Sequence, residues 1–204
     1  MALGITSGGV KIPLGLWEGS TENATVATAL LSDLVERGID TTQGVLCVID
    51  GSKALRTAVR DVLGERAPVQ RCVGHKERNV LGHLPERDRA TVRRRLRAAW
   101  DERGHKRALG CLEQLATELS RTHPGAAASL REGMAETLIL TRLGITGQMK
   151  RTLISTNPID SMIECVRRTS RNAKRWSSGE MALRWTAAGM QEAERQFPRI
   201  VGYR

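Results

Sequence analysis

The stretch Val45-Leu46-Cys47-Val48-Ile49-Asp50-Gly51-Ser52 decides how the rest of the sequence is interpreted. It begins with an apolar run, rich in β-branched side chains and too short for a typical helix. Such a run indicates a strand buried on both faces, as in a sheet with parallel pairing. The strand ends at Asp50, and the apolar spacing of a helix follows, at Leu55, Ala58, Val59 and Val62.

Two strands and a helix are predicted before this stretch. Apolar residues alternate with others over Val10–Leu16, the period of a strand with one buried face. The turn Ser7-Gly8-Gly9 joins it to a partner strand predicted over Ala2–Thr6. A helix ending at Gly38 then follows, with its apolar stripe at Ala27, Leu30, Leu31 and Leu34.

The middle of the chain is predicted to be helical. After a short strand over Val69–Cys72, residues 85–143 show no strand signal. Apolar stripes indicate helices over 92–100 and 108–119, and we expect a third helix over 126–142.

The last part of the chain is also predicted to be helical. Asn157-Pro158 is typical of a helix start, because Asn caps the first turn and Pro suits its first position. Together the patterns predict an α/β fold in three parts: a sheet-and-helix part over 1–84, an all-helical insertion over 85–150, and C-terminal helices over 151–204.

Composition and charge narrow the classes of function. Of the 204 residues, 40% are hydrophobic and 26% charged, which is typical of a soluble globular protein. The net charge of +10 favours a polyanionic partner, usually nucleic acid, although charge alone leaves an ordinary basic enzyme as an alternative. Scattered cysteines and the lack of an apolar run of about 18 residues predict a cytoplasmic protein without a membrane span.

Asp50 is the first candidate for chemistry. It follows a buried strand, and ligand crevices in α/β sheets lie at the carboxyl ends of strands. A carboxylate in that position can bind Mg²⁺, which prefers oxygen ligands. The structural alternative, that Asp50 or Ser52 only caps the following helix, stays open.

Asp160 is the second candidate. It lies in the first turn of a predicted helix, where a carboxylate can also serve as a structural partner of the cap amide. At helical spacing it shares a face with Glu164, Arg168, Arg171 and Arg175. Such a face suits a metal site beside a DNA backbone, since Arg binds phosphate through its planar fork. A solvated face with a Glu164–Arg168 ion pair is the structural alternative.

Cys72 and His75 form a Cys-x-x-His motif. It is a weak zinc half-site, because no second ligand pair stands at a finger-like spacing. A structural role for both side chains is favoured over metal binding.

Five stretches, taken in order along the chain, resemble the mutator-type insertion-sequence transposases of prokaryotes. The similarity covers nearly the whole chain, and the closing stretch is similar to an actinobacterial branch of the family. The stretches are Leu16–Asn23, Val48–Ser52, Arg71–Val80, Ser155–Ile163, and the closing residues 171–176 with 184–190.

The resemblance implies an RNase-H-like catalytic core of the DDE type, interrupted by a helical insertion. Asp50 matches the second acidic position, and Asp160 stands where the family normally has Glu. Cys72 and His75 match the family's Cys-or-Asp, two residues, His signature. The implied chemistry is phosphoryl transfer with two Mg²⁺ or Mn²⁺ ions. The implied partner is DNA, both the transposon ends and the target. The residues expected to bind it are Arg168, Arg171, Lys174 and Arg175.

Two departures from the family pattern lower the expected activity. The family's first Asp lies on the strand before the Gly8-Gly9 hairpin, near the strand's start, and this sequence begins after it. Asp160 is also one methylene shorter than Glu. We therefore expect a C-terminal fragment with impaired catalysis and without the family's N-terminal DNA-binding region. It would lie at the nucleoid and could form a homo-oligomer or associate with full-length transposase. The alternative is a non-catalytic, DNA-binding regulator that competes with full-length transposase.

Overall fold

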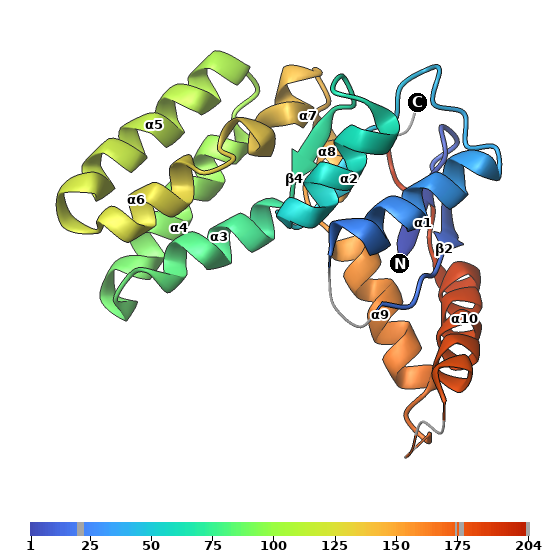
Figure 1. The fold of residues 1–204 in the computed structure, drawn as a ribbon. Coiled ribbons are helices and arrows are strands. Elements are labelled where there is room, and N and C mark those ends of the chain that lie inside the picture. Colours follow the sequence, from blue (N-terminus) through green and yellow to red (C-terminus); the bar gives the residue numbers. More distant parts are fainter. Residues whose placement is uncertain (20–22, 174, 176–177, 203–204) are drawn as a thin grey trace. The chain divides into compact units, whose positions relative to one another are not determined.

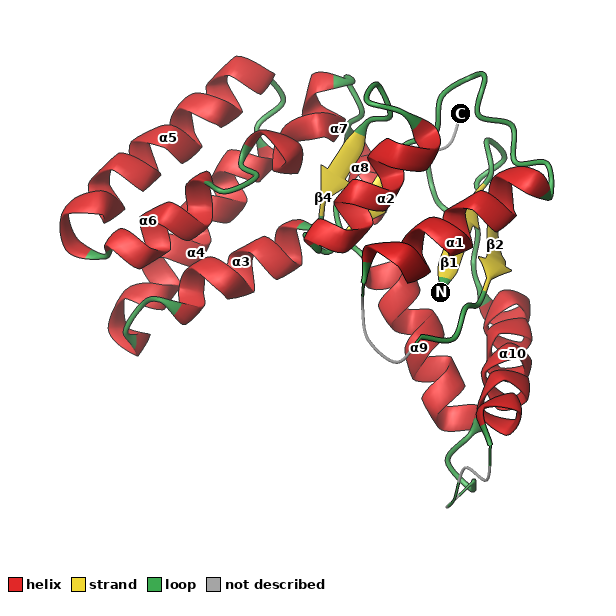
Figure 2. Ribbon diagram, viewed as in Figure 1, coloured by secondary structure: helices red, strands yellow, loops and turns green. Residues whose placement is uncertain are grey.

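The computed structural model describes residues 1–204 except 20–22, 174, 176–177 and 203–204. Helices predominate, and short strands form two small sheets (Figures 1 and 2). The chain divides into two compact units. The terminal unit contains residues 1–45, 53–67 and 157–204, and the central unit contains residues 46–52 and 68–156.

The hairpin predicted at the start of the chain is confirmed in the terminal unit. β1 (Ala2–Ile5) pairs antiparallel with β2 (Lys11–Gly15). Helix α1 (Ala24–Glu36) packs on β2 and on α2 (Lys53–Leu63). The side chain of Asn23 caps α1 by accepting a hydrogen bond from the amide of Val26 at 2.9 Å, so a local polar signal starts this helix.

Two long helices complete the terminal unit. α9 (Asn157–Thr169) begins at the predicted Asn-Pro signal, and α10 (Gly179–Gln196) packs along it. The two backbones approach closely at Gly189, where an added Cβ would lie 2.6 Å from the Cα of Val166. Small and apolar side chains fill the contact: Met162, Cys165, Val166, Met190 and Ala193.

A parallel strand pair lies in the central unit, as the apolar run predicts. β3 (Cys47–Ile49) pairs with β4 (Val69–Arg71), so the strand is shorter than the apolar run that predicts it. The pairing continues one step beyond β4, where the amide of Cys72 donates to the carbonyl of Ile49 at 2.7 Å. The residues that follow the two strands therefore lie at the same edge.

Helices form the rest of the central unit. Leu96, Leu112 and Leu115 are among the fully buried side chains of its core, which fits the apolar stripes read from the sequence. The helices are α3 (Val73–Gly82), α4 (Glu86–Asp101), α5 (His105–Thr122), α6 (Pro124–Arg131), α7 (Ile139–Arg142), α8 (Gly147–Leu153) and the 3₁₀ turn η1 (Ala135–Leu138).

The single helix expected over 126–142 is wrong. The segment breaks at Gly133, which takes a φ of +64° between α6 and η1. Buried Gln70 of β4 satisfies the backbone beyond the break. Its amide donates to the carbonyl of Thr137 at 2.9 Å and its oxygen accepts from the amide of Leu140 at 3.1 Å. Side-chain hydrogen bonds from a distant strand thus replace bonds that a continuous helix would make.

The mixture of helices and a parallel strand pair agrees with an α/β fold. The RNase-H-like sheet and the three-part division at residues 84 and 150 stay predictions. No helix among the described residues is both long enough and apolar enough to cross a membrane.

Candidate functional site

The carboxyl edge of the parallel strand pair carries two of the predicted site residues. Asp50 directly follows β3, and Cys72 directly follows β4. Since both strands run the same way and Cys72 is hydrogen-bonded to Ile49, this edge brings the two positions side by side. The central unit contains this neighbourhood.

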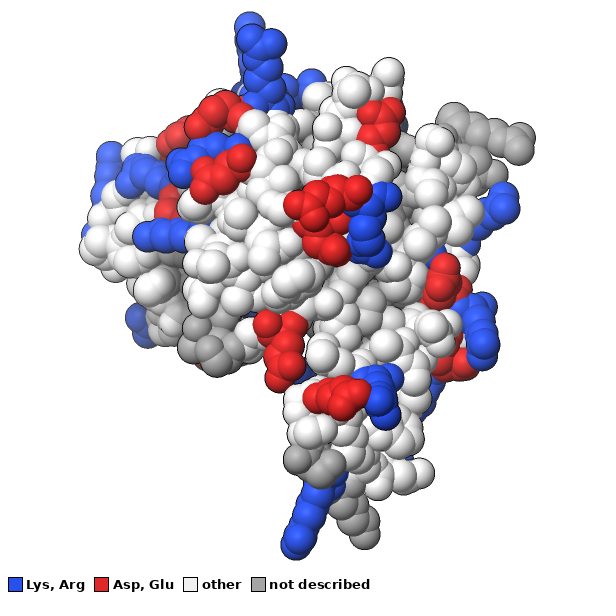
Figure 3. All heavy atoms as spheres, turned by 45° about the vertical axis from the view of Figure 1, so that its right-hand side comes forward, with Lys and Arg blue, Asp and Glu red and all other residues white. Residues whose placement is uncertain are grey.

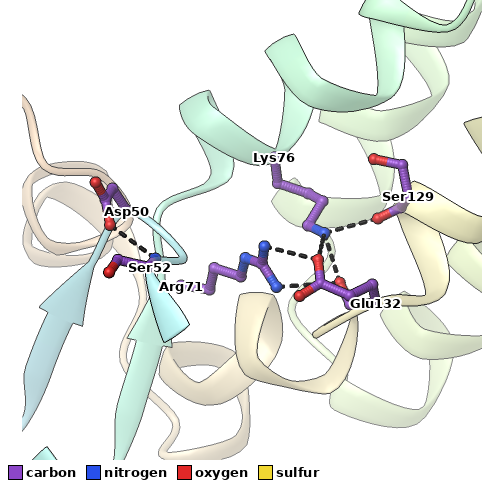
Figure 4. A network of polar contacts seen from close by, with 6 residues as sticks. All are labelled: Asp50, Ser52, Arg71, Lys76, Ser129 and Glu132. Atoms are coloured by element: carbon purple, nitrogen blue, oxygen red, sulfur yellow. Dashed lines mark hydrogen bonds and ion pairs between the residues drawn. The ribbon is translucent and has the colours of Figure 1, made fainter. Parts of the chain in front are cut away.

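The Asp50 side chain is half-buried at a tight turn. Its Oδ1 accepts a hydrogen bond from the amide of Ser52 at 2.9 Å, and Gly51 between them takes a φ of +107° (Figure 4). This bond orients the carboxylate, as Asx turns do. Among the described residues no other group bonds to the carboxylate, so its second oxygen is left for a ligand.

Cys72, His75 and Thr156 form a compact cluster beside this edge. His75 Nδ1 lies 3.3 Å from Cys72 Sγ and 3.4 Å from Thr156 Oγ1. Thr156 donates to Cys72 Sγ from its amide at 3.3 Å and from its hydroxyl at 3.5 Å. The thiol and one imidazole nitrogen are thus engaged in hydrogen bonds, and the structural role of the pair stays a prediction.

Thr156 is a residue of this cluster for which sequence reasoning assigns no role. It lies 81 positions from His75, so no local pattern connects them. A backbone bond from the Val73 amide to the carbonyl of Ile154 at 3.1 Å joins the same two segments. These bonds hold the segment 154–156 against the end of β4 within the central unit.

Asp160 lies exposed in the first turn of α9. No described residue forms a hydrogen bond or ion pair with its side chain, so the structure does not show the cap bond that the sequence allows. Asp50 belongs to the central unit and Asp160 to the terminal unit, and their convergence on shared metal ions stays a prediction.

The Glu164–Arg168 ion pair, which is the structural alternative for this helix face, is not formed among the described residues. Glu164 instead lies 3.7 Å from Arg167 Nη1. Arg168 donates to Gln196 Oε1 of α10 at 2.7 Å, because that acceptor lies beside it once the two helices pack together. Of the other residues predicted to bind DNA, Arg171 and Arg175 are exposed, while Lys174 lies outside the described residues.

The basic excess of residues 86–107 is partly neutralised within the central unit. Arg93 and Arg97 of α4 lie 3.2 Å and 2.8 Å from the carboxylate of Glu77 on α3. Arg95 pairs with Glu118 of α5 at 2.5 Å. On the face drawn in Figure 3, Lys and Arg stand beside Asp and Glu, and the described residues form no continuous field of one sign there.

Carboxylate oxygens are the ligands that Mg²⁺ prefers, so the donor chemistry of Asp50 and Asp160 fits the ion. In neither unit do three or more described His, Cys, Asp or Glu side chains gather into one cluster that could hold a metal ion.

A charge network of buried Arg71 and Lys76 with half-exposed Glu132 lies behind the Asp50 turn (Figure 4). Arg71 Nη2 lies 2.7 Å from Glu132 Oε2, and Lys76 Nζ lies 2.9 Å from the same oxygen. Together they hold the pKa of the Glu132 carboxyl at about 2, chiefly through the hydrogen bond from Arg71. Burial lowers the pKa of Lys76. Glu132 is 61 positions from Arg71, and no signal in the sequence points to this pairing.

Comparison of the sequence with known proteins points to one family. Residues 1–199 match the family described as Transposase, Mutator family. A probable transposase for an insertion sequence element of Corynebacterium diphtheriae is 29% identical over 185 residues, which covers 90% of this chain and 52% of the relative. The transposase for insertion sequence element IST2 of Acidithiobacillus ferrooxidans is 26% identical over 195 residues, 96% of this chain and 64% of the relative.

A third relative is the transposase for insertion sequence element ISRM3 of Rhizobium meliloti. It is 26% identical over 200 residues, which covers 98% of this chain and 49% of the relative. The chain thus spans about half to two thirds of the length of these relatives. The family match extends over both compact units, and the chain therefore belongs to the mutator family of transposases.

Proposed function

We propose that the chain forms part of a DDE-type transposase core, RNase-H-like in its sheet, that moves an insertion sequence by phosphoryl transfer on DNA. The observation that carries the proposal is the position of Asp50. A half-buried, oriented carboxylate at the carboxyl edge of a parallel strand pair is suited to an active site, and here it occurs in a member of a transposase family.

Asp50 and Asp160 would hold divalent metal ions, Mg²⁺ or Mn²⁺. When bound, such ions activate the attacking oxygen and stabilise charge on the leaving oxygen. Asp50 is fixed by the Ser52 amide, so one carboxylate needs little reorganisation to accept a ligand. Exposed Arg171 and Arg175 would bind DNA phosphates, with Arg168 and Lys174 beside them in sequence.

Asp160 limits this activity. Its carboxylate is one methylene short of the Glu that the family resemblance implies, and a misplacement of about 1 Å costs about 10²-fold in rate. We infer that cleavage is weak and that DNA binding, which depends on other residues, persists. The protein would act in the cytoplasm, at the nucleoid, where its DNA lies.

Metal-dependent cleavage of DNA bearing an insertion-sequence end tests the proposal. We expect weak cleavage in Mg²⁺ or Mn²⁺ that Asp50→Asn abolishes. Asp61→Asn, which alters an exposed carboxylate on α2, is the matched control and leaves cleavage unchanged. Salt-sensitive DNA binding without any cleavage supports the regulator instead, and cleavage retained in Asp50→Asn overturns the assignment of the metal ligand.

A further inference from the structure

We propose that Arg71 is a positioning residue for Asp50, and that Glu132 holds Arg71 in the conformation required. The inference deepens the proposed function, since it concerns how the candidate metal ligand is held in place. It rests on the contact between the Arg71 guanidinium and the turn that follows Asp50.

The guanidinium lies directly against the backbone of Gly51. A Cβ added to Gly51 would lie 2.5 Å from Arg71 Nε and 2.7 Å from Nη2, so a side chain there would displace the guanidinium. Gly51 also takes a φ of +107°, which favours glycine independently. Because Gly51 stands between Asp50 and the amide that orients it, the planar guanidinium limits where this turn can lie.

Glu132 fixes the guanidinium from its other side. Besides the ion pair at 2.7 Å, Arg71 Nη1 donates to the carbonyl of Glu132 at 3.3 Å. The next residue, Gly133, also lies against Arg71, and an added Cβ there would lie 2.2 Å from Nη1. The guanidinium is therefore flanked by two glycine backbones, one after the candidate ligand and one at the break between α6 and η1.

Burial makes this arrangement more than a surface ion pair. The Arg71 side chain is only 7% exposed, and its Nε has no hydrogen-bond partner among the described residues. A buried cation with an unsatisfied donor is costly, and apolar side chains of similar volume often replace such groups without loss of stability. A positioning role of the rigid, flat guanidinium at the Asp50 turn accounts for keeping a buried cation that costs stability.

Lys76 offers a matched control inside the same network. Its ammonium is fully buried and donates to Glu132 Oε2 at 2.9 Å and to the carbonyl of Ser129 at 2.7 Å. It shares the Glu132 carboxylate with Arg71, whereas the three atoms nearest to a Cβ added at Gly51 all belong to Arg71. A change at Lys76 therefore disturbs the network without removing the proposed support of Asp50.

The experiment compares Arg71→Met with Lys76→Met in the full chain. Hydrogen exchange at the Ser52 amide reports whether the Asp50 turn is held. We expect exchange to accelerate about tenfold or more in Arg71→Met and less than about twofold in Lys76→Met. Glu132→Gln, which keeps the carbonyl contact but weakens the ion pair, should give an intermediate acceleration. Equal acceleration in Arg71→Met and Lys76→Met, or none in either, overturns the proposal.

A second readout separates this inference from the proposed function. Mn²⁺ binding, followed by the relaxation rate of solvent protons, should weaken about tenfold in Arg71→Met and remain within about twofold in Lys76→Met. Asp50→Asn serves as the reference for loss of the ligand. If the unaltered chain binds no Mn²⁺, the metal assignment fails, while the Ser52 amide still decides whether Arg71 holds the turn.

Discussion

At the scale of single residues, the length of one side chain decides how active the proposed site can be. Asp160 lies exposed in the first turn of α9, with no described partner to hold it. Asp160→Glu extends the carboxylate by one methylene, so we expect metal-dependent cleavage of end-bearing DNA to rise about 10- to 100-fold. Asp160→Asn should abolish cleavage. Initial rates in Mg²⁺ check both, and a Glu variant no faster than the unaltered chain would argue against Asp160 as a ligand.

Glu132 is a residue whose charge affects stability in a defined pH range. Its pKa of about 2 lies below the ordinary 4.5, so its ionised form adds stability above about pH 4.5 that is lost as the pH falls toward 2. Arg71 and Lys76 face the carboxylate, and Glu136 acts on Lys76 through its charge. We expect Glu132→Gln to lower the free energy of unfolding at pH 6 by about 1–2 kcal/mol, since solvent screens a half-exposed carboxylate.

Urea denaturation at pH 6 and pH 3 measures this difference. The gap between the unaltered chain and Glu132→Gln should narrow as the pH falls, because the carboxyl is protonated first in the unfolded chain and, near pH 2, in the folded chain as well. Other carboxylates titrate alike in the two proteins and cancel from the comparison. A gap of equal size at both pH values would show that the ion pairs of Glu132 add nothing to stability.

At the scale of elements, the segment that ends at Thr156 is anchored within the central unit by a strand end that is distant in sequence. Thr156→Val removes the hydroxyl that contacts Cys72 Sγ and His75 Nδ1 but keeps the backbone amide. We expect a loss of about 1 kcal/mol in the free energy of unfolding. Thr152→Val in α8 is the control, since its hydroxyl only bonds back to its own helix at Gln148. Urea titration compares the two, and an equal or larger loss in Thr152→Val contradicts an anchoring role.

Local sequence patterns predict some helices and strands correctly and fail for others. The apolar run before Asp50 predicts a buried parallel strand, because both faces of such a strand avoid water. The segment 126–142 is expected to form one helix, yet the chain breaks at Gly133. Gln70 and Arg71, which lie far away in the sequence, contact the segment on both sides of the break.

At the scale of the whole molecule, the charge of +10 bears on DNA binding. Each cation that neutralises a phosphate adds about 0.9 to the slope of log affinity against log salt. We expect steep salt dependence, and Arg171→Ala and Arg175→Ala should each reduce the slope by about one. Arg95→Ala is the control, because Glu118 already neutralises that side chain. Fluorescence anisotropy from 50 to 300 mM salt measures the slopes, and an affinity independent of salt contradicts the proposal.

The sequence by itself determined the secondary structure that surrounds the candidate site, the place of Asp50 after a strand and of Asp160 in a first helical turn, and the family. These features follow from hydrophobic periodicity, capping residues and short motifs, all of which act over a few neighbouring positions. Tertiary structure alone decided the contacts of Thr156 with Cys72 and of Glu132 with Arg71, across 84 and 61 positions. Such pairings form because buried polar groups must find hydrogen-bond partners in the compact chain. A local sequence pattern cannot predict which distant residue becomes the partner.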